Sequence, residues 1–138
     1  MAGTAPASVV YRDDEVLCFM GIQPSAPGEC MVIPLTHVDH FTDLDEALAA
    51  KVMAVAHRVG RRVREAFEPE RVGFVVHGYG VPHAHLLVVP QHGPDHVTSD
   101  RFARVVGGEV AFGVEHVPVP PRDALNRDAE RIRAGLRG

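Results

Sequence analysis

The pattern of apolar and polar residues predicts three short strands in the first third of the chain. Val9 to Tyr11 and Val16 to Phe19 are β-prone runs separated by four polar residues, which is typical of a hairpin. The loop from Gln23 to Gly28 holds two prolines, which exclude a regular strand there. The run from Cys30 to Ile33 is predicted as a third strand that ends at Pro34.

A continuous apolar stripe predicts a long helix in the middle of the chain. Apolar side chains recur at steps of three or four residues, at Leu44, Leu48, Val52, Val55, Val59, Val63 and Phe67. Thr42 or Asp43 is expected to cap the start of this helix, and Pro69 to end it. The arginines from Arg58 to Arg64 suit the C-terminal half of the helix dipole. They are interpreted as a solvated helix face or, alternatively, as charges that attract an anionic ligand.

Two further strands and a last helix are predicted in the second half. The strands span residues 72–76 and 84–89, and the glycines of the connection between them permit positive φ. Pro90 is expected to close the second strand. Residues 91–121 are predicted as loop with a weak helix near 99–106. Asp123 is expected to cap a final helix whose apolar positions are Leu125, Ala129, Ile132 and Leu136.

Length and composition indicate a single α+β domain. The chain has 138 residues, of which 46% are hydrophobic, enough for one core but short for two domains. We expect a disordered tail at 1–8, a main domain at 9–91 and a C-terminal extension at 92–138 packed on that domain. A net charge of −4 argues against nucleic acid as the partner, and no apolar run is long enough for a membrane span.

The two cysteines indicate a reducing compartment. Cys18 and Cys30 lie in apolar runs, so we expect buried thiols rather than a disulfide, in a cytoplasmic protein without a secretory signal. An all-histidine zinc site stays an alternative, but the sequence has no paired cysteine clip, and we expect no metal and no cofactor. His40, His92 and His96 are expected to be exposed loop residues.

Two histidines lie on one face of the strand predicted at 84–89 and its approach. Side chains alternate along a strand, so His83, His85 and Leu87 share one face while the opposite face is apolar and typical of a core. A buried imidazole needs hydrogen-bonding partners and tends to stay neutral, and a neutral ring nitrogen is a nucleophile. The spacing alone allows either a structural or a catalytic pair.

The ordered blocks from Val9 to Gln91 resemble the histidine-triad (HIT) family. The first half is similar to the family's hairpin, proline-containing loop and strand end, as in VYRDDEVLCFMGIQPSAPGECMVIPLTHVDHFTDLDE. The segment VPHAHLLVVP is similar to the family signature His-x-His-x-His. The resemblance implies a five-stranded antiparallel sheet with a long central helix and a C-terminal helix. It also implies a homodimer that acts on the α-phosphate of a nucleotide.

The resemblance also implies roles for individual residues. His85 matches the middle histidine, which attacks phosphorus and forms a covalent nucleotidyl-histidine that water or another acceptor then resolves. His83 matches the first histidine, which holds the backbone and hydrogen-bond geometry. Contacts to a small-molecule substrate such as a nucleotide are expected from His37, Phe19, Ile22, Gly78 and Leu87.

Four features depart from the family pattern where substrate would lie. Leu87 stands at the third triad position and can donate no hydrogen bond, and loss of one such donor costs about 10²–10³ in rate. Gly21 stands where an aspartate commonly holds ribose hydroxyls. His77 replaces an asparagine, and the loop from Gly78 to Pro82 is short. His77 either faces the pocket, where it replaces the missing donor in part, or lies at a peripheral strand end.

Three functions follow from these observations. The favoured one is a divergent HIT-type hydrolase or transferase with a covalent intermediate on His85 and with His83 and His77 as the other catalytic candidates. The alternative is a HIT scaffold used for non-nucleotide small-molecule chemistry or binding, as in a specialised biosynthetic pathway. A dimeric interaction module is the third, and it leaves the pair of histidines at His83 and His85 unexplained.

Overall fold

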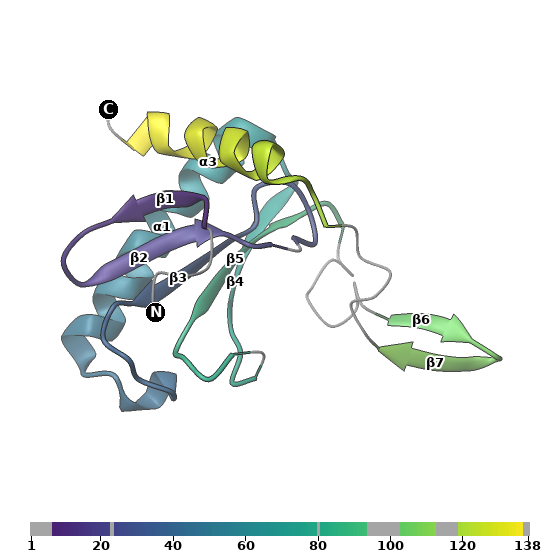
Figure 1. Cartoon of the computed structure of the whole chain (residues 1–138), viewed down its shortest axis with the longest axis horizontal. Helices are drawn as coiled ribbons and strands as arrows, with labels where there is room; N and C mark the ends of the chain where they lie inside the picture. The colour runs from purple at the N-terminus through teal and green to yellow at the C-terminus, as the bar shows by residue number, and fades with distance from the viewer. Residues whose placement is uncertain (1–6, 23, 80, 94–102, 113–118, 137–138) are drawn as a thin grey trace.

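The chain forms a five-stranded antiparallel sheet with helices packed against it (Figure 1). The computed structural model describes residues 7–22, 24–79, 81–93, 103–112 and 119–136. The sheet has the order β1-β2-β3-β5-β4. Its strands are β1 (Val9–Arg12), β2 (Val16–Met20), β3 (Cys30–Pro34), β4 (Arg71–Val76) and β5 (Leu86–Gln91). This architecture confirms the predicted α+β class and the five-stranded sheet.

The long helix α1 (Glu46–Phe67) covers one face of the sheet (Figure 1). Its buried side is the predicted apolar stripe, with Val52, Val55, Val59 and Val63 in the core. The expected cap was wrong: Asp45 is the N-cap, and its side chain accepts a hydrogen bond from the Leu48 amide at 2.8 Å. Thr42 and Asp43 lie instead in a short 3₁₀ helix, Phe41–Asp43.

The C-terminal helix α3 (Arg122–Leu136) completes the core, as predicted. Leu125, Ala129 and Ile132 are buried against α1 and the β1 end of the sheet. Arg62 of α1 fastens the two helices together, because its guanidinium donates to the carbonyl oxygens of Ile132 at 3.3 Å and Arg131 at 2.7 Å. Arg62 therefore departs from the predicted solvated face of arginines on α1, because it contacts α3.

A second, two-stranded sheet lies to one side of the main sheet (Figure 1). It consists of β6 (Ala103–Val106) and β7 (Glu109–Phe112). The weak helix expected near 99–106 was therefore wrong at 103–106, and 99–102 lie outside the described residues. Gly107 and Gly108, with φ of 59° and 84°, supply the two-residue turn that suits the twist of a tight hairpin.

Strand β5 continues past Pro90, where the sequence predicted its end. β3 pairs with β5 only at Leu86, Leu87 and Val88, whereas β4 pairs with it as far as Gln91. At Pro90 the strand has only β4 beside it, so the missing amide removes no bond to β3.

Asp13 holds the turn between β1 and β2. Its carboxylate accepts hydrogen bonds from the amides of Glu15 and Val16, both at 2.8 Å, and from the Tyr11 hydroxyl at 2.7 Å. The Lys51 ammonium of α1 lies 2.9 Å away. Burial alone would raise the pKa of Asp13, but these hydrogen bonds outweigh it and hold the pKa well below its usual range.

Replacing Asp13 with alanine is expected to lower the free energy of unfolding at pH 7 by about 1–3 kcal/mol, because two amides and a hydroxyl lose their acceptor. A lowered pKa means that the carboxylate stabilises the fold above its ordinary value of 3.8 and that this contribution is lost as pH falls below it. The difference between Asp13→Ala and the wild type should therefore shrink at pH 3. Urea unfolding at both pH values measures it. The exposed neighbour, changed as Asp14→Ala, is the control, and an equal loss in both variants would contradict the assignment.

Candidate active site

The candidate site forms where the segment after β3 meets the segment before β5. His83 and His85 are 9% and 5% exposed, and His37, which follows β3, is exposed. Two contacts hold this region together: the ring of His83 donates to the carbonyl oxygen of Pro34 at the end of β3, and the Ala84 amide donates to the carbonyl oxygen of Val38 at 2.6 Å. These contacts fix the approach to β5 at His83 and Ala84.

Hydrogen bonds define the ring orientation of His83. Its Nε2–H donates to the Pro34 carbonyl oxygen at 2.8 Å, while its Nδ1 lies 3.2 Å from Nδ1 of His37. Since Nε2 carries the proton of a neutral ring, Nδ1 of His83 accepts from the Nδ1–H of His37. The two rings meet edge to face with centroids 5.2 Å apart. The structure thus brings His37 and His83 together.

The ring of His85 is bound through the other nitrogen, Nδ1, whereas His83 is bound through Nε2. Its Nδ1–H donates to the carbonyl oxygen of His83 at 2.7 Å. A neutral ring fixed in this way carries its lone pair on Nε2, the nitrogen far from the main chain. Within the described part of the chain, no polar atom forms a hydrogen bond to that Nε2. A ring with an acceptor behind it and a lone pair in front is arranged as a nucleophile.

The side chains beside His85 belong to the sheet face that α1 does not cover. Leu86 is fully buried in the core on the α1 side, so Leu87 points to the other face. Strand pairing places Leu87 between Met31 of β3 and Val75 of β4, and Met31 beside Phe19 of β2. We call these four half-buried residues, Phe19, Met31, Leu87 and Val75, the apolar row. The apolar row lines the surface of the sheet next to His85.

Three other predicted site residues are exposed. His77 follows β4, and its Nδ1 accepts from the Tyr79 amide at 3.1 Å, so its own loop orients the ring. Gly78 has open space around it and does not use the positive φ that glycine permits, and Gly80 lies outside the described residues. Ile22 is 56% exposed in the loop after β2.

A buried carboxylate lies on the same sheet face as the apolar row, and the sequence did not single it out. Glu29, directly before β3, is 8% exposed, and its Oε1 accepts from the Ser25 hydroxyl at 2.6 Å. The sequence signal that could have identified Glu29 is its position directly before Cys30, a fully buried strand residue. Charged side chains are seldom buried without a role or a partner.

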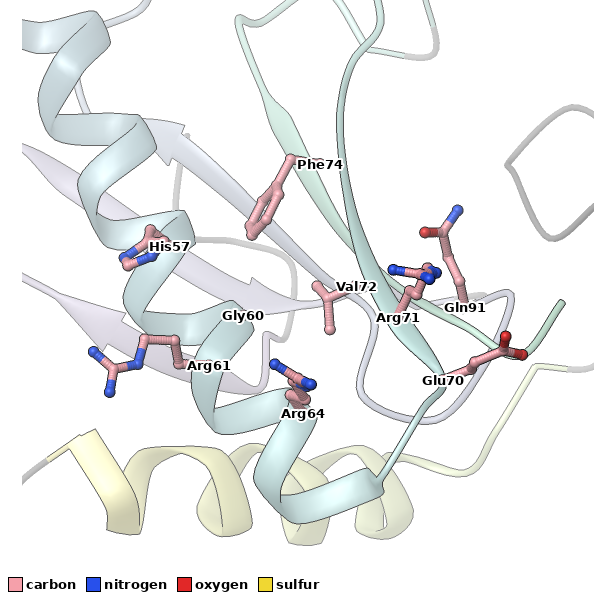
Figure 2. Close-up of a pocket in the computed structure, with 9 residues that line it drawn as sticks. All are labelled: His57, Gly60, Arg61, Arg64, Glu70, Arg71, Val72, Phe74 and Gln91. Atoms are coloured by element: carbon pink, nitrogen blue, oxygen red, sulfur yellow. The ribbon is translucent and has the colours of Figure 1, made fainter. Parts of the chain in front are cut away.

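A surface pocket of about 340 Å³ lies between α1 and β4 (Figure 2). Phe74 and Val72 of β4 line it from the sheet, and Arg61 and Arg64 line it from α1. These β4 side chains face α1, because Gly60 of that helix lies directly against them. The pocket is therefore on the opposite face of the sheet from His85 and takes no part in the histidine site.

Other predictions concern metals, thiols and membranes. Among the described residues no three His, Cys, Asp or Glu side chains meet as a metal site. Cys18 and Cys30 are buried free thiols, as predicted, and the hydrogen bond with Cys18, together with burial, raises the pKa of Cys30. His40 and His92 are exposed as expected, and His96 lies outside the described residues. The helices that the structure describes include none long and apolar enough to span a membrane.

Comparisons with known proteins agree on one family. Residues 2–94 match the HIT domain. Protein hit of Bacillus subtilis is 30% identical over 98 residues, which cover 67% of this chain and 68% of that protein. The crystal structure of a Hit-like protein involved in cell-cycle regulation from Bartonella henselae superposes with a TM-score of 0.75 at 26% identity, over 96% of this chain and 88% of that one. A zinc-bound histidine triad family protein from Mycobacterium smegmatis gives 0.73 at 26% identity, over 99% and 88%.

Proposed function

This chain belongs to the HIT family, and from that membership we propose that it hydrolyses or transfers nucleotides through a covalent intermediate on His85. The observation that carries the proposal is the hydrogen bond from Nδ1–H of His85 to the His83 carbonyl oxygen, at 2.7 Å. It directs the Nε2 lone pair away from the main chain and keeps the ring from rotating. Splitting one displacement at phosphorus into two steps is what such a nucleophile accomplishes.

The reaction proceeds by two displacements. Nε2 of His85 attacks the α-phosphorus, a P–N bond forms, and the leaving group departs with the electron pair of its bond to phosphorus and takes up a proton. The positive charge that develops on the ring is stabilised by the Nδ1–H bond to the His83 carbonyl. Water, or another acceptor, then attacks phosphorus, loses a proton, and releases His85 in its starting form.

His83 and His37 serve as positioning residues in this proposal. Their contact with each other and with the Pro34 carbonyl fixes the His83 backbone, whose oxygen orients His85. Neither ring needs to touch the reacting phosphorus. Phe19 and Leu87 of the apolar row, with Ile22 and Gly78 at exposed positions nearby, are the proposed substrate contacts.

Leu87 is proposed to occupy the third position of the His-x-His-x-His signature. Its side chain cannot protonate a leaving group, so that proton must come from elsewhere. The pairing of Val76 with Leu86 brings His77, the residue directly after β4, to the level of His85. We propose His77 as the substitute donor, once its loop releases the ring from the Tyr79 amide. The apolar row also favours the second candidate function, binding of a non-nucleotide small molecule.

Turnover of AMP phosphoramidate and of dinucleoside polyphosphates tests the proposed function. Release of AMP by the wild-type protein, and not by His85→Ala, supports it. Binding of AMP without turnover of any of these compounds would contradict the enzymatic proposal and favour a binding role for the same face.

We also propose that the protein is a cytoplasmic homodimer joined through the outer edge of β4. Within the described residues no strand pairs with that edge, and Phe74 and Val76 of β4 are 40% and 49% exposed. An unpaired apolar edge is a template for another strand, and a second copy brings the same edge for two-fold pairing. The free thiols of Cys18 and Cys30 support the reducing compartment.

Changing Val76 to glutamate is expected to convert the dimer to a monomer, because a charged side chain on an edge strand opposes its pairing with another strand. Size-exclusion chromatography with light scattering measures the mass. Val119, which is 62% exposed outside β4, provides the matched control as Val119→Glu. A wild-type protein that is monomeric at the same concentration would overturn the proposed interface.

A further inference from the structure

The pocket between α1 and β4 has an apolar wall on its sheet side (Figure 2). Phe74 and Val72 form this wall, and Gly60 of α1 lets the Phe74 ring lie directly against the helix, because a Cβ on Gly60 would lie only 2.7 Å from the end of that ring. Phe74 nevertheless stays 40% exposed. Part of an aromatic surface is therefore open to a ligand at this place.

Three arginines, which we call the pocket arginines, line the same pocket. Arg61 and Arg64 come from α1 and Arg71 from the start of β4, and all three are exposed. Figure 2 shows Arg64 reaching from the helix toward Val72. The pocket lining also includes one carboxylate, that of Glu70. Three guanidinium groups against one carboxylate leave an excess of positive charge, which attracts an anion.

The pocket arginines on α1 differ from the other arginines of that helix. Arg58 lies over an aromatic ring of β1 at 5.1 Å from its centroid, and Arg62 donates to carbonyl oxygens of α3, so both contribute to the fold. Within the part of the chain that the structure describes, no carboxylate forms an ion pair with any pocket arginine. Their hydrogen-bond donors are therefore available to a ligand.

The donors and the charge favour a phosphate monoester over a carboxylate. A guanidinium forms paired hydrogen bonds with either group. A carboxylate offers two oxygens and one charge, whereas a phosphate monoester offers three acceptor oxygens and a charge of about −1.5 to −2 at pH 7. It can therefore bond to guanidinium groups from the helix and the strand together. The volume of about 340 Å³ is at the small end of the range for ligand sites.

We propose that this pocket binds a small aromatic phosphate monoester, with its phosphate on Arg64 and Arg71 and its ring on Phe74. The pocket lies on the opposite face of the sheet from His85, so the inference does not rest on the proposed function. It is also compatible with the proposed dimer. Pairing of β4 with a second copy would use the backbone edge of the strand, whereas Val72 and Phe74 point toward α1.

Isothermal titration calorimetry with phenyl phosphate tests the proposal, at a fixed ionic strength because salt screens exposed charges. The wild-type protein is expected to bind phenyl phosphate at least about tenfold more tightly than inorganic phosphate, which lacks the ring. A similar preference is expected over benzoate, which has the ring but a single charge and two oxygens. Amide chemical shifts locate the site, and we expect them to move at residues 57–64 and 70–74 but not at 83–87.

Two variants test the arginines, and a third is the control. Arg64→Gln and Arg71→Gln should each weaken the binding of phenyl phosphate by about tenfold, through loss of hydrogen bonds between charged groups. Arg12→Gln removes the same charge from an exposed position on β1, at the other edge of the sheet, and should change the affinity by less than about twofold. Thermal melts report whether each variant remains folded.

The outcomes separate this inference from the proposed function. Absence of binding of phenyl phosphate, equal weakening by Arg12→Gln, or shifts centred on residues 83–87 would overturn the site. Inorganic phosphate or benzoate bound as tightly as phenyl phosphate would overturn the ligand class. None of these measurements needs turnover, so a protein inactive toward AMP phosphoramidate can still confirm the pocket.

Discussion

Replacing His85 with alanine is expected to reduce nucleotide turnover by about 10⁴-fold or more, as loss of a covalent nucleophile does in other enzymes. The reason lies in the ring geometry: Nδ1–H is bound to the His83 carbonyl oxygen, and Nε2 carries the lone pair. The ring nitrogens of His83 are both engaged, since its Nε2–H donates to Pro34 and its Nδ1 accepts from His37, whereas the Nδ1–H of His37 is bound to a ring nitrogen and not to a backbone carbonyl.

The rate of AMP release from AMP phosphoramidate measures this loss. His40→Ala, at an exposed loop histidine, is the matched control and should retain full activity. His83→Ala should lie between the two, because it disturbs the orientation of His85 but leaves the nucleophile. Retention of more than a tenth of the activity by His85→Ala would show that another group attacks phosphorus.

Replacing Leu87 with histidine is expected to raise turnover of AMP phosphoramidate by about 10²–10³-fold, because it adds a preorganised donor beside the reacting phosphorus. Leu87 is half-buried between Met31 and Val75, so an imidazole of similar size fits the row with its ring on the His85 face. The donor acts in the transition state, so kcat should rise with little change in KM.

Leu87→Met is the control for this gain, since it repacks the row without adding a donor. Its kcat should stay within about threefold of the wild type. An unchanged or lower kcat in a folded Leu87→His protein would mean that the leaving group does not pass over position 87, or that His77 already supplies its proton.

Much of the fold could be predicted because its signals are local. The apolar stripe of α1 and the alternation in β5 need only the helical and strand periods. The N-cap of α1 was misplaced because Asp43 and Asp45 flank Leu44, the first residue of the apolar stripe, and only the structure shows which one reaches a free amide. The hairpin at 103–112 was missed although Gly107 and Gly108 stand between the β-prone segments 104–106 and Glu109–Phe112, the sequence signature of a two-residue turn.

The site could be predicted only as far as alternation along one strand allows. Sequence places His83 and His85 on one face, but the bond from His83 to Pro34 joins residues 49 positions apart. It depends on how β3 and β5 pair. The approach of Glu29 to Gly21 likewise depends on the register of β2 and β3, which no single strand specifies.

Intact mass spectrometry after rapid acid-free quenching with AMP phosphoramidate tests the central claim most directly. We expect a mass increase of one nucleotidyl group per chain, located on His85 by peptide mapping and absent from His85→Ala. Turnover with no adduct at any time, or an adduct on another residue, would contradict nucleophilic attack by this imidazole.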